Sequence, residues 1–154
     1  MNATDSADAR PTGDGGWHLR LTNDPGDLPL LHGWIDELSL ALGLGPEVTF
    51  AADLCLQEAV SNVIAHAFPD NASHEIGVSA SLIGRDLILE VEDDGSPFDP
   101  LAVPPPEAVD RLEDVRIGGL GIHLIRRFAS RMRYAREGER NRLTMVIDSH
   151  GKGA

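Results

Sequence analysis

The chain has 154 residues, a formal net charge of -12 and a hydrophobic content of 42%. This length fits one domain, and the negative charge would repel the phosphate backbone of nucleic acids. The single cysteine, Cys55, excludes an internal disulfide, and the lack of a run of about 20 apolar residues argues against a membrane span. We therefore expect one cytoplasmic domain that binds neither nucleic acid nor membrane.

The first part of the chain predicts a tail, a strand and a helix. Residues 1–16 are polar and contain no apolar signal core, so we interpret them as a disordered N-terminal tail before a single domain over 17–148. Apolar and polar residues alternate in Trp17–Leu21, which predicts a strand. Apolar residues at helical spacing from Leu28 to Leu42 predict an amphipathic helix that ends near Gly43.

A second helix is predicted from Pro46, which suits a first helical turn, to Ala67. It is apolar almost all round, and two stripes of polar residues at four-residue spacing interrupt it. The stripes consist of Asp53, Gln57 and Ser61, and of Glu58, Asn62 and His66. A carboxylate and an amide on a buried helix need polar partners. Either they satisfy each other locally or they face a polar ligand, and the spacing leaves both readings open.

Two strands follow, over Glu75–Leu82 and Asp86–Val91, with a tight turn at Gly84-Arg85 between them. After Asp93 the alternation stops, and five prolines make the stretch from about 96 to 118 irregular. A connection of this length inside a compact domain is usually a functional loop, so we interpret it as a lid.

A third helix is predicted over Leu120–Ala129, and two closing strands are predicted over Met132–Arg136 and Leu143–Ile147. Hairpin-linked strands with helices between them predict an α+β fold. We expect a two-layer α/β sandwich in which a mostly antiparallel, mixed sheet carries the helices on one face.

Two glycine-containing clusters accompany the polar stripe on the second helix. Asp93-Asp94-Gly95 ends a strand, where a carboxylate can accept a hydrogen bond and a glycine lets the chain turn beneath a flat ligand. The same three residues also make a common turn. Gly118-Gly119-Leu120-Gly121 opens a helix, whose unpaired backbone amides and dipole favour an anion such as phosphate.

In this order, the three clusters resemble the N box and the two glycine boxes of the GHKL (Bergerat-fold) ATPase superfamily. Gln57–Asn62 with His66–Phe68 is similar to the N box of one branch, the anti-sigma factor serine/threonine kinases. Val91–Asp99 is similar to the first glycine box of that branch, and Gly119–Ile125 to the second. Each box is a weak indication alone, but their order and spacing are specific, and the resemblance covers about 17–147.

The resemblance implies that the domain, a histidine-kinase-like ATPase domain, binds ATP and Mg²⁺. Asn62 would be a metal ligand and an ATP-binding residue, and Asp93 would accept a hydrogen bond from the adenine amino group. Gly95 would let the base pack against the end of the sheet. Glu58 would be the general base that takes the proton of the attacking hydroxyl.

The second glycine box and the end of the chain supply the remaining implied contacts. Gly119, Leu120 and Gly121 would surround the phosphates. Arg116 is the lid cation nearest to these glycines and is a candidate contact of the terminal phosphate. The last motif of the superfamily is usually rich in Gly and Thr, and here it reads Asn141–Thr144, so Thr144 is the expected pocket residue.

The resemblance further implies an ATP-dependent anti-sigma factor and protein serine/threonine kinase. Such a protein sequesters a sigma factor and phosphorylates a small anti-anti-sigma antagonist, and we expect a homodimer, since members of this branch often pair. The alternative is a non-catalytic switch, in which bound ATP only sets the lid conformation and the affinity for partners.

Overall fold

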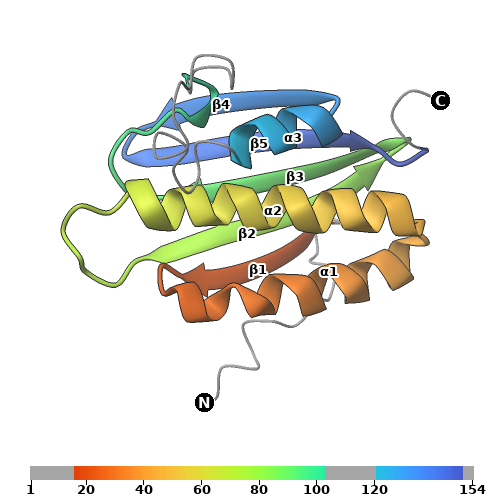
Figure 1. Ribbon diagram of the computed structural model, residues 1–154, viewed down its shortest axis with the longest axis horizontal. Coiled ribbons are helices and arrows are strands. Elements are labelled where there is room, and N and C mark those ends of the chain that lie inside the picture. Colours follow the sequence, from red (N-terminus) through yellow and green to blue (C-terminus); the bar gives the residue numbers. More distant parts are fainter. Residues whose placement is uncertain (1–15, 103–120, 151–154) are drawn as a thin grey trace, which may run out of the picture.

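The computed structural model describes residues 16–102 and 121–150. The described strands are β1 (Trp17–Thr22), β2 (Glu75–Ile83), β3 (Asp86–Asp93), β4 (Arg131–Glu137) and β5 (Arg140–Asp148). They form one sheet in the order β1-β2-β3-β5-β4, and every neighbouring pair is antiparallel (Figure 1).

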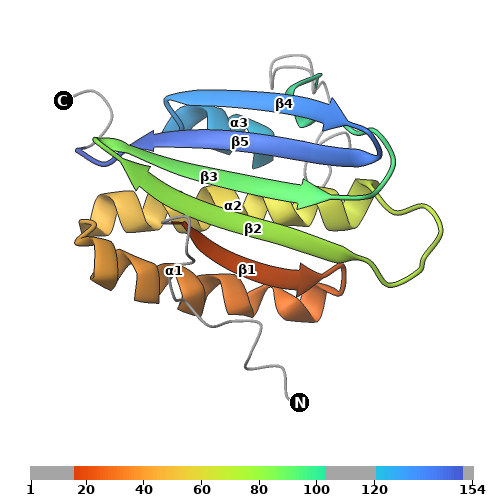
Figure 2. The same ribbon diagram turned by 180° about the vertical axis from the view of Figure 1, so that it is seen from behind.

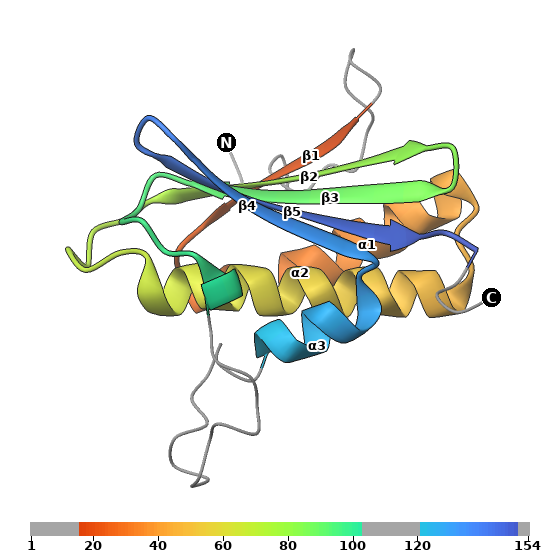
Figure 3. The same cartoon turned by 90° about the horizontal axis from the view of Figure 1, so that it is seen from above.

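Three α-helices lie on one face of this sheet: α1 (Pro29–Leu42), α2 (Pro46–His66) and α3 (Gly121–Phe128). Figure 3 shows the two layers edge-on, with the helices on one side. Figure 2 shows that none of the described helices lies on the other face of the sheet. Two short 3-10 helices, η2 (Pro25–Asp27) and η3 (Pro100–Ala102), lie in connections. The predicted α+β two-layer fold is therefore confirmed, with a fully antiparallel sheet among the described strands.

Local residue chemistry accounts for the boundaries of the elements. Gly43 ends α1 in the left-handed conformation, with φ 70°, and Pro46 occupies the first turn of α2. Gly84, with φ 61°, supplies the left-handed residue that the β2–β3 hairpin turn requires. These positions explain why the predicted boundaries agree with the observed ones to within a few residues.

Strict alternation along the central strands decides which side chains face the helices. In β3 the buried residues are Leu87, Leu89, Val91 and Asp93, whereas the residues between them face the open side. A polar residue in this alternating row, Asp93, therefore lies on the helix-covered face with the hydrophobic core.

The helix α2 supplies the centre of the core, where Cys55 is fully buried as expected for a small hydrophobic side chain. Within the described residues it is the one helix whose length and apolar composition would suffice to cross a membrane. In the fold it packs against β3, β5, α1 and α3. The same apolar composition is what a central core helix requires.

Candidate functional site

The helix α2 places Asn62 on the face that turns toward the sheet. This side chain is 2% exposed, and neither its Oδ1 nor its Nδ2 has a hydrogen-bond partner among the described residues. A buried polar group without a partner destabilises a fold by about 1–3 kcal/mol. Buried unpaired amides are uncommon for this reason, and this one marks a position where a ligand can supply the missing partners.

The carboxylate of Asp93, at the end of β3, is also 2% exposed. Its Oδ1 accepts hydrogen bonds from the Gly95 backbone N–H at 2.8 Å and from Asn141 Nδ2 at 2.9 Å. Burial raises the pKa of Asp93, and these two hydrogen bonds oppose that rise. No partner of Oδ2 is found in the described part of the chain, so this oxygen remains an available acceptor.

Asn141, on β5, is the buried partner that holds Asp93. Its Nδ2 also donates to the Ser96 carbonyl at 2.8 Å, while its Oδ1 accepts from Tyr134 Oη at 2.5 Å and Arg136 Nη1 at 3.1 Å. Sequence reasoning did not select Asn141, Tyr134 or Arg136. The alternation from 141 to 147 was the available indication, because it places Asn141 in the same buried row as Leu143.

Gly95 brings the end of β3 against the end of α2. A Cβ built on Gly95 would lie 2.7 Å from the Ala67 Cβ, which is closer than real Cβ atoms approach. The next residue, Ser96, donates its backbone N–H to the Ala67 carbonyl at 2.8 Å. The predicted close turn at Gly95 is therefore present, although here it accommodates α2 itself.

A narrow cavity separates Asn62 from Asp93, and Phe98, Tyr134 and Asn141 also line it. Its volume is about 20 Å³, which is enough for about one water molecule. His66, the third member of the polar stripe, is exposed and stacks on Phe98 with 5.0 Å between ring centroids. This cavity is too small for a planar base, so a base would enter only if some of the lining residues moved.

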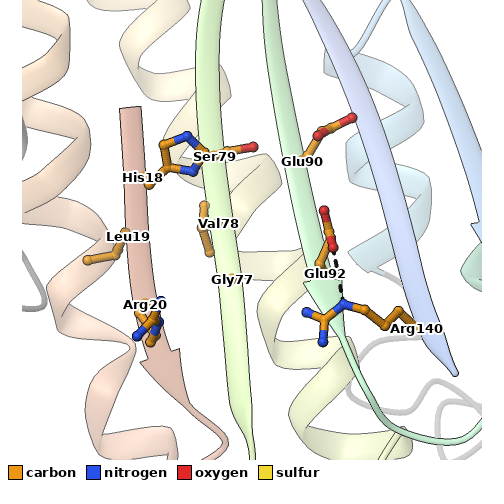
Figure 4. A pocket seen from close by; sticks show the side chains of 9 residues that line it. All are labelled: His18, Leu19, Arg20, Gly77, Val78, Ser79, Glu90, Glu92 and Arg140. Carbon is orange, nitrogen blue, oxygen red and sulfur yellow. Dashed lines mark hydrogen bonds and ion pairs between the residues drawn. The ribbon is translucent and has the colours of Figure 1, made fainter. Parts of the chain in front are cut away.

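Thr144 does not line this cavity, which corrects the expectation from the last motif. It pairs with Glu90 in the sheet register, and its hydroxyl donates to Glu90 Oε2 at 3.1 Å. Both residues face the open side of the sheet, opposite Asp93. Figure 4 shows this open side, where Glu90 and Glu92 border a trough lined also by side chains of β1 and β2. We therefore replace Thr144 by Asn141 in the candidate site.

The other predicted site residues fall into two groups. Glu58 lies one turn before Asn62 on α2, is half-buried, and has no hydrogen-bond or ion-pair partner within residues 16–102 and 121–150. Gly121, the last glycine of the predicted phosphate-binding box, begins α3. Arg116, Gly119 and Leu120 lie outside the described residues, as do most of the predicted lid and of the predicted tail.

The side chains that line the cavity can be compared with the ligands that Mg²⁺ prefers. Asn62 offers a side-chain oxygen that has no partner in the described part of the chain, and such oxygen ligands suit this hard cation. The described residues contain no group of three or more His, Cys, Asp or Glu that could hold a metal ion by themselves. Mg²⁺ is usually held by one or two protein ligands together with substrate phosphates. The residues present therefore fit an ion that arrives with a nucleotide.

A helix amide and a strand-end carboxylate that face one cavity, beneath an antiparallel sheet, define the class of ATP-binding domains found in histidine kinases. The comparison with protein families agrees. Residues 21–147 match the family described as histidine kinase-like ATPase domain, and the chain belongs to this family.

Two characterised relatives are protein kinases by name. The chain is 28% identical to the serine/threonine-protein kinase BtrW of Bordetella bronchiseptica over 116 residues, which are 75% of this chain and 82% of that protein. It is 34% identical to the serine-protein kinase RsbW of Listeria innocua over 76 residues, covering 47% of this chain and 48% of that protein.

Among solved structures, a blue-light activated histidine kinase of Erythrobacter litoralis has a similar fold, with a TM-score of 0.51 and 20% sequence identity. The similarity covers 77% of this chain and 41% of that one, so this chain spans less than half of the sensor kinase. At this identity the likeness concerns the fold alone.

Proposed function

We propose that this protein is an ATP-dependent protein serine/threonine kinase of the anti-sigma factor type. The observation that carries the proposal is a pair of side chains that line one cavity: the Asp93 carboxylate and the Asn62 amide, which has no partner among the described residues. The similarity to BtrW over most of both chains supports the kinase activity. ATP would bind with its adenine amino group on Asp93 and its phosphates toward Asn62 and the start of α3.

In this proposal each candidate site residue has one role. Asp93 Oδ2 accepts the adenine amino hydrogen, and Gly95 allows the chain to turn at the edge of the base. Asn62 would hold Mg²⁺, which would neutralise charge on the phosphates. The backbone amides at Gly119, Leu120 and Gly121 contact the phosphates, and Arg116 is a candidate contact of the terminal one.

Glu58 is the proposed general base. The hydroxyl oxygen of the substrate attacks the γ-phosphorus of ATP, and its proton moves to the Glu58 carboxylate. The bond between the γ-phosphorus and the bridging oxygen breaks, and ADP leaves with that electron pair. A half-buried carboxylate one turn from the metal ligand suits this role, because none of the described residues forms an ion pair with it.

The proposed partners are proteins. By analogy with the anti-sigma branch, the domain would bind a sigma factor in the cytoplasm and thereby regulate transcription, and it would phosphorylate a small anti-anti-sigma protein. We also propose a homodimer, which sedimentation analysis of the full chain would test directly.

A phosphate-transfer assay tests the enzymatic part of the proposal. The protein is incubated with radiolabelled ATP, Mg²⁺ and an anti-anti-sigma protein from the same organism. Glu58→Gln is expected to lower transfer by about 10²-fold or more while ATP binding is retained. Asp53→Asn is the matched control, because Asp53 lies on the other polar stripe of α2 and contacts His32 at 2.9 Å.

Two outcomes would contradict this function. Full transfer by Glu58→Gln would remove Glu58 from the mechanism. Tight binding of ATP without transfer to any such partner would favour the non-catalytic switch, in which ATP only changes the affinity for a sigma factor.

A further inference from the structure

Arg136 connects two parts of the site that are far apart in the sequence. Its Nη1 donates to the Gly95 carbonyl at 2.7 Å and to Asn141 Oδ1 at 3.1 Å. The register of β4 and β5 places Arg136 directly opposite Asn141, and Tyr134 lies two residues earlier on the same edge strand. Two donors from β4 therefore meet on one amide oxygen of β5.

These donors fix the orientation of the Asn141 amide. With Oδ1 toward Tyr134 and Arg136, Nδ2 points toward two acceptors, Asp93 Oδ1 at 2.9 Å and the Ser96 carbonyl at 2.8 Å. If the amide were turned over, its oxygen would face two acceptors and its NH₂ group would face two donors. Only the observed orientation satisfies every member of this buried network.

The orientation of Asn141 in turn decides which oxygen Asp93 can offer. The Gly95 N–H and Asn141 Nδ2 both donate to Oδ1, so Oδ2 remains without a partner among the described residues. Burial raises the pKa of Asp93. The hydrogen bonds from Asn141 and Gly95 and the positive charge of Arg136 oppose that rise, while the neighbouring Asp94 adds to it.

We propose that Arg136 is a positioning residue for base recognition, which acts through Asn141 to present Asp93 Oδ2 to the amino group of a 6-aminopurine. The inference rests on the proposed binding of ATP, but it concerns a residue that acts through Asn141 and not on the nucleotide itself. The inference also predicts which purine base the network favours. A 6-oxopurine has a carbonyl where adenine has its amino group, so it would meet a carboxylate oxygen with an acceptor.

The experiment measures the dissociation constants of ATP and inosine triphosphate, each with Mg²⁺, by calorimetric titration of the full chain. We expect Arg136→Gln to weaken ATP binding by about tenfold and to leave the weak binding of inosine triphosphate unchanged. The preference for the 6-amino base therefore falls. A variant that merely loosened the fold would weaken both nucleotides equally.

Three further variants sharpen the result. Arg136→Lys retains one donor and is expected to restore part of the preference, whereas Tyr134→Phe removes the other donor and is expected to lower it less than Arg136→Gln does. Arg142→Gln is the matched control, because Arg142 lies on β5 but pairs with Glu92 and Glu137 on the open face. It should leave both dissociation constants unchanged.

An unchanged preference in Arg136→Gln, or an equal loss for both nucleotides, would overturn the inference while the wild-type protein still bound ATP. If Arg136→Gln failed to fold, Tyr134→Phe would decide in the same way. Failure of the proposed function is a different result, since the wild-type protein would then bind neither nucleotide.

Discussion

Gly95 and Ala67 touch so closely that no side chain fits between them. A Cβ on Gly95 would lie 2.7 Å from the Ala67 Cβ and 2.9 Å from its carbonyl carbon. This contact joins the end of β3, which carries Asp93, to the end of α2, which carries Asn62. The spacing of the two groups across the cavity therefore depends on Gly95, whose backbone N–H also donates to the Asp93 carboxylate.

Gly95→Ala is predicted to destabilise the protein, because the added methyl group must displace backbone atoms of α2. Such overpacking typically lowers the free energy of unfolding by about 1–3 kcal/mol. Thermal denaturation measures the effect, and for a chain of this size we expect a fall of about 2–4 °C per kcal/mol. The control is Gly77→Ala on β2, where an added Cβ meets nothing within 4 Å. Equal melting temperatures for the two variants would contradict the packing argument.

Asn62→Ala is predicted to preserve or raise stability and to reduce the stabilisation by nucleotide. It removes a buried amide that has no partner among the described residues, which recovers about 1 kcal/mol or more against a small loss of packing. Melting curves with and without Mg-ATP measure both effects, because a ligand at about 100 times its dissociation constant stabilises by about 2.7 kcal/mol.

Ser39→Ala on α1 is the control for this variant. Its hydroxyl is also buried and unpartnered among the described residues, but it does not line the cavity. We expect it to be as stable as the wild-type protein or more so, with the full nucleotide shift. A normal Mg-ATP shift in Asn62→Ala would contradict the assignment of Asn62.

Asn141 and Thr144, three residues apart on β5, are predicted to differ sharply in their effect on nucleotide binding. Asn141→Leu leaves Asp93 with one fewer donor and should weaken ATP binding by about tenfold or more. Thr144→Val acts on the open face, where the hydroxyl contacts Glu90, and should leave ATP affinity unchanged. Calorimetric titration of both variants provides the comparison, and a larger effect of Thr144→Val would restore the sequence-based assignment.

His74 is predicted to make stability depend on pH. Its Nε2 lies 3.0 Å from the Asp70 carboxylate and its Nδ1 lies 3.1 Å from Asp94 Oδ1. The hydrogen bond to Asp70 is the largest cause that raises the pKa of His74 above its ordinary 6.5, and Asp94 adds to it. A histidine whose pKa is higher in the folded state stabilises the protein fully below pH 6.5. This stabilisation is lost as the pH rises through the raised pKa.

Denaturant unfolding of the wild-type protein and His74→Gln across this pH range measures the difference between them. The difference should be largest at low pH and should shrink as the pH rises above 6.5. In Asp70→Asn the loss should move to lower pH, because the strongest partner of the imidazolium is gone. An identical pH profile in wild-type protein and Asp70→Asn would contradict this explanation.

The sequence predicted the elements because their boundaries depend on local chemistry. Gly43, Pro46 and Gly84 each specify a backbone conformation by themselves, and the alternation in β3 specifies the buried face without knowledge of its neighbours. The clusters that contain Asn62 and Asp93 were likewise recognised from the sequence, since their order is specific to one superfamily.

The hydrogen-bond partners of Asp93 could not be predicted from the sequence in this way. Asn141 lies 48 residues further along the chain, and its contact with Asp93 exists because the β3–β5 register pairs these two positions. Arg136 reaches the same point through the register of β4 with β5. A local sequence pattern cannot predict how two distant strands align. The pocket residue of the last motif was therefore predicted from residue type alone, which favoured Thr144. In the structure it is Asn141 that lies on the buried side of β5.

Calorimetric titration of Mg-ATP into the full chain, with Asp93→Asn and Asn62→Ala measured in parallel, decides whether this pocket binds the nucleotide. We expect saturable binding of one nucleotide to the wild-type protein, and binding weakened by about tenfold or more in each variant. A wild-type protein that gave no binding heat and no shift in melting temperature with Mg-ATP would contradict this expectation.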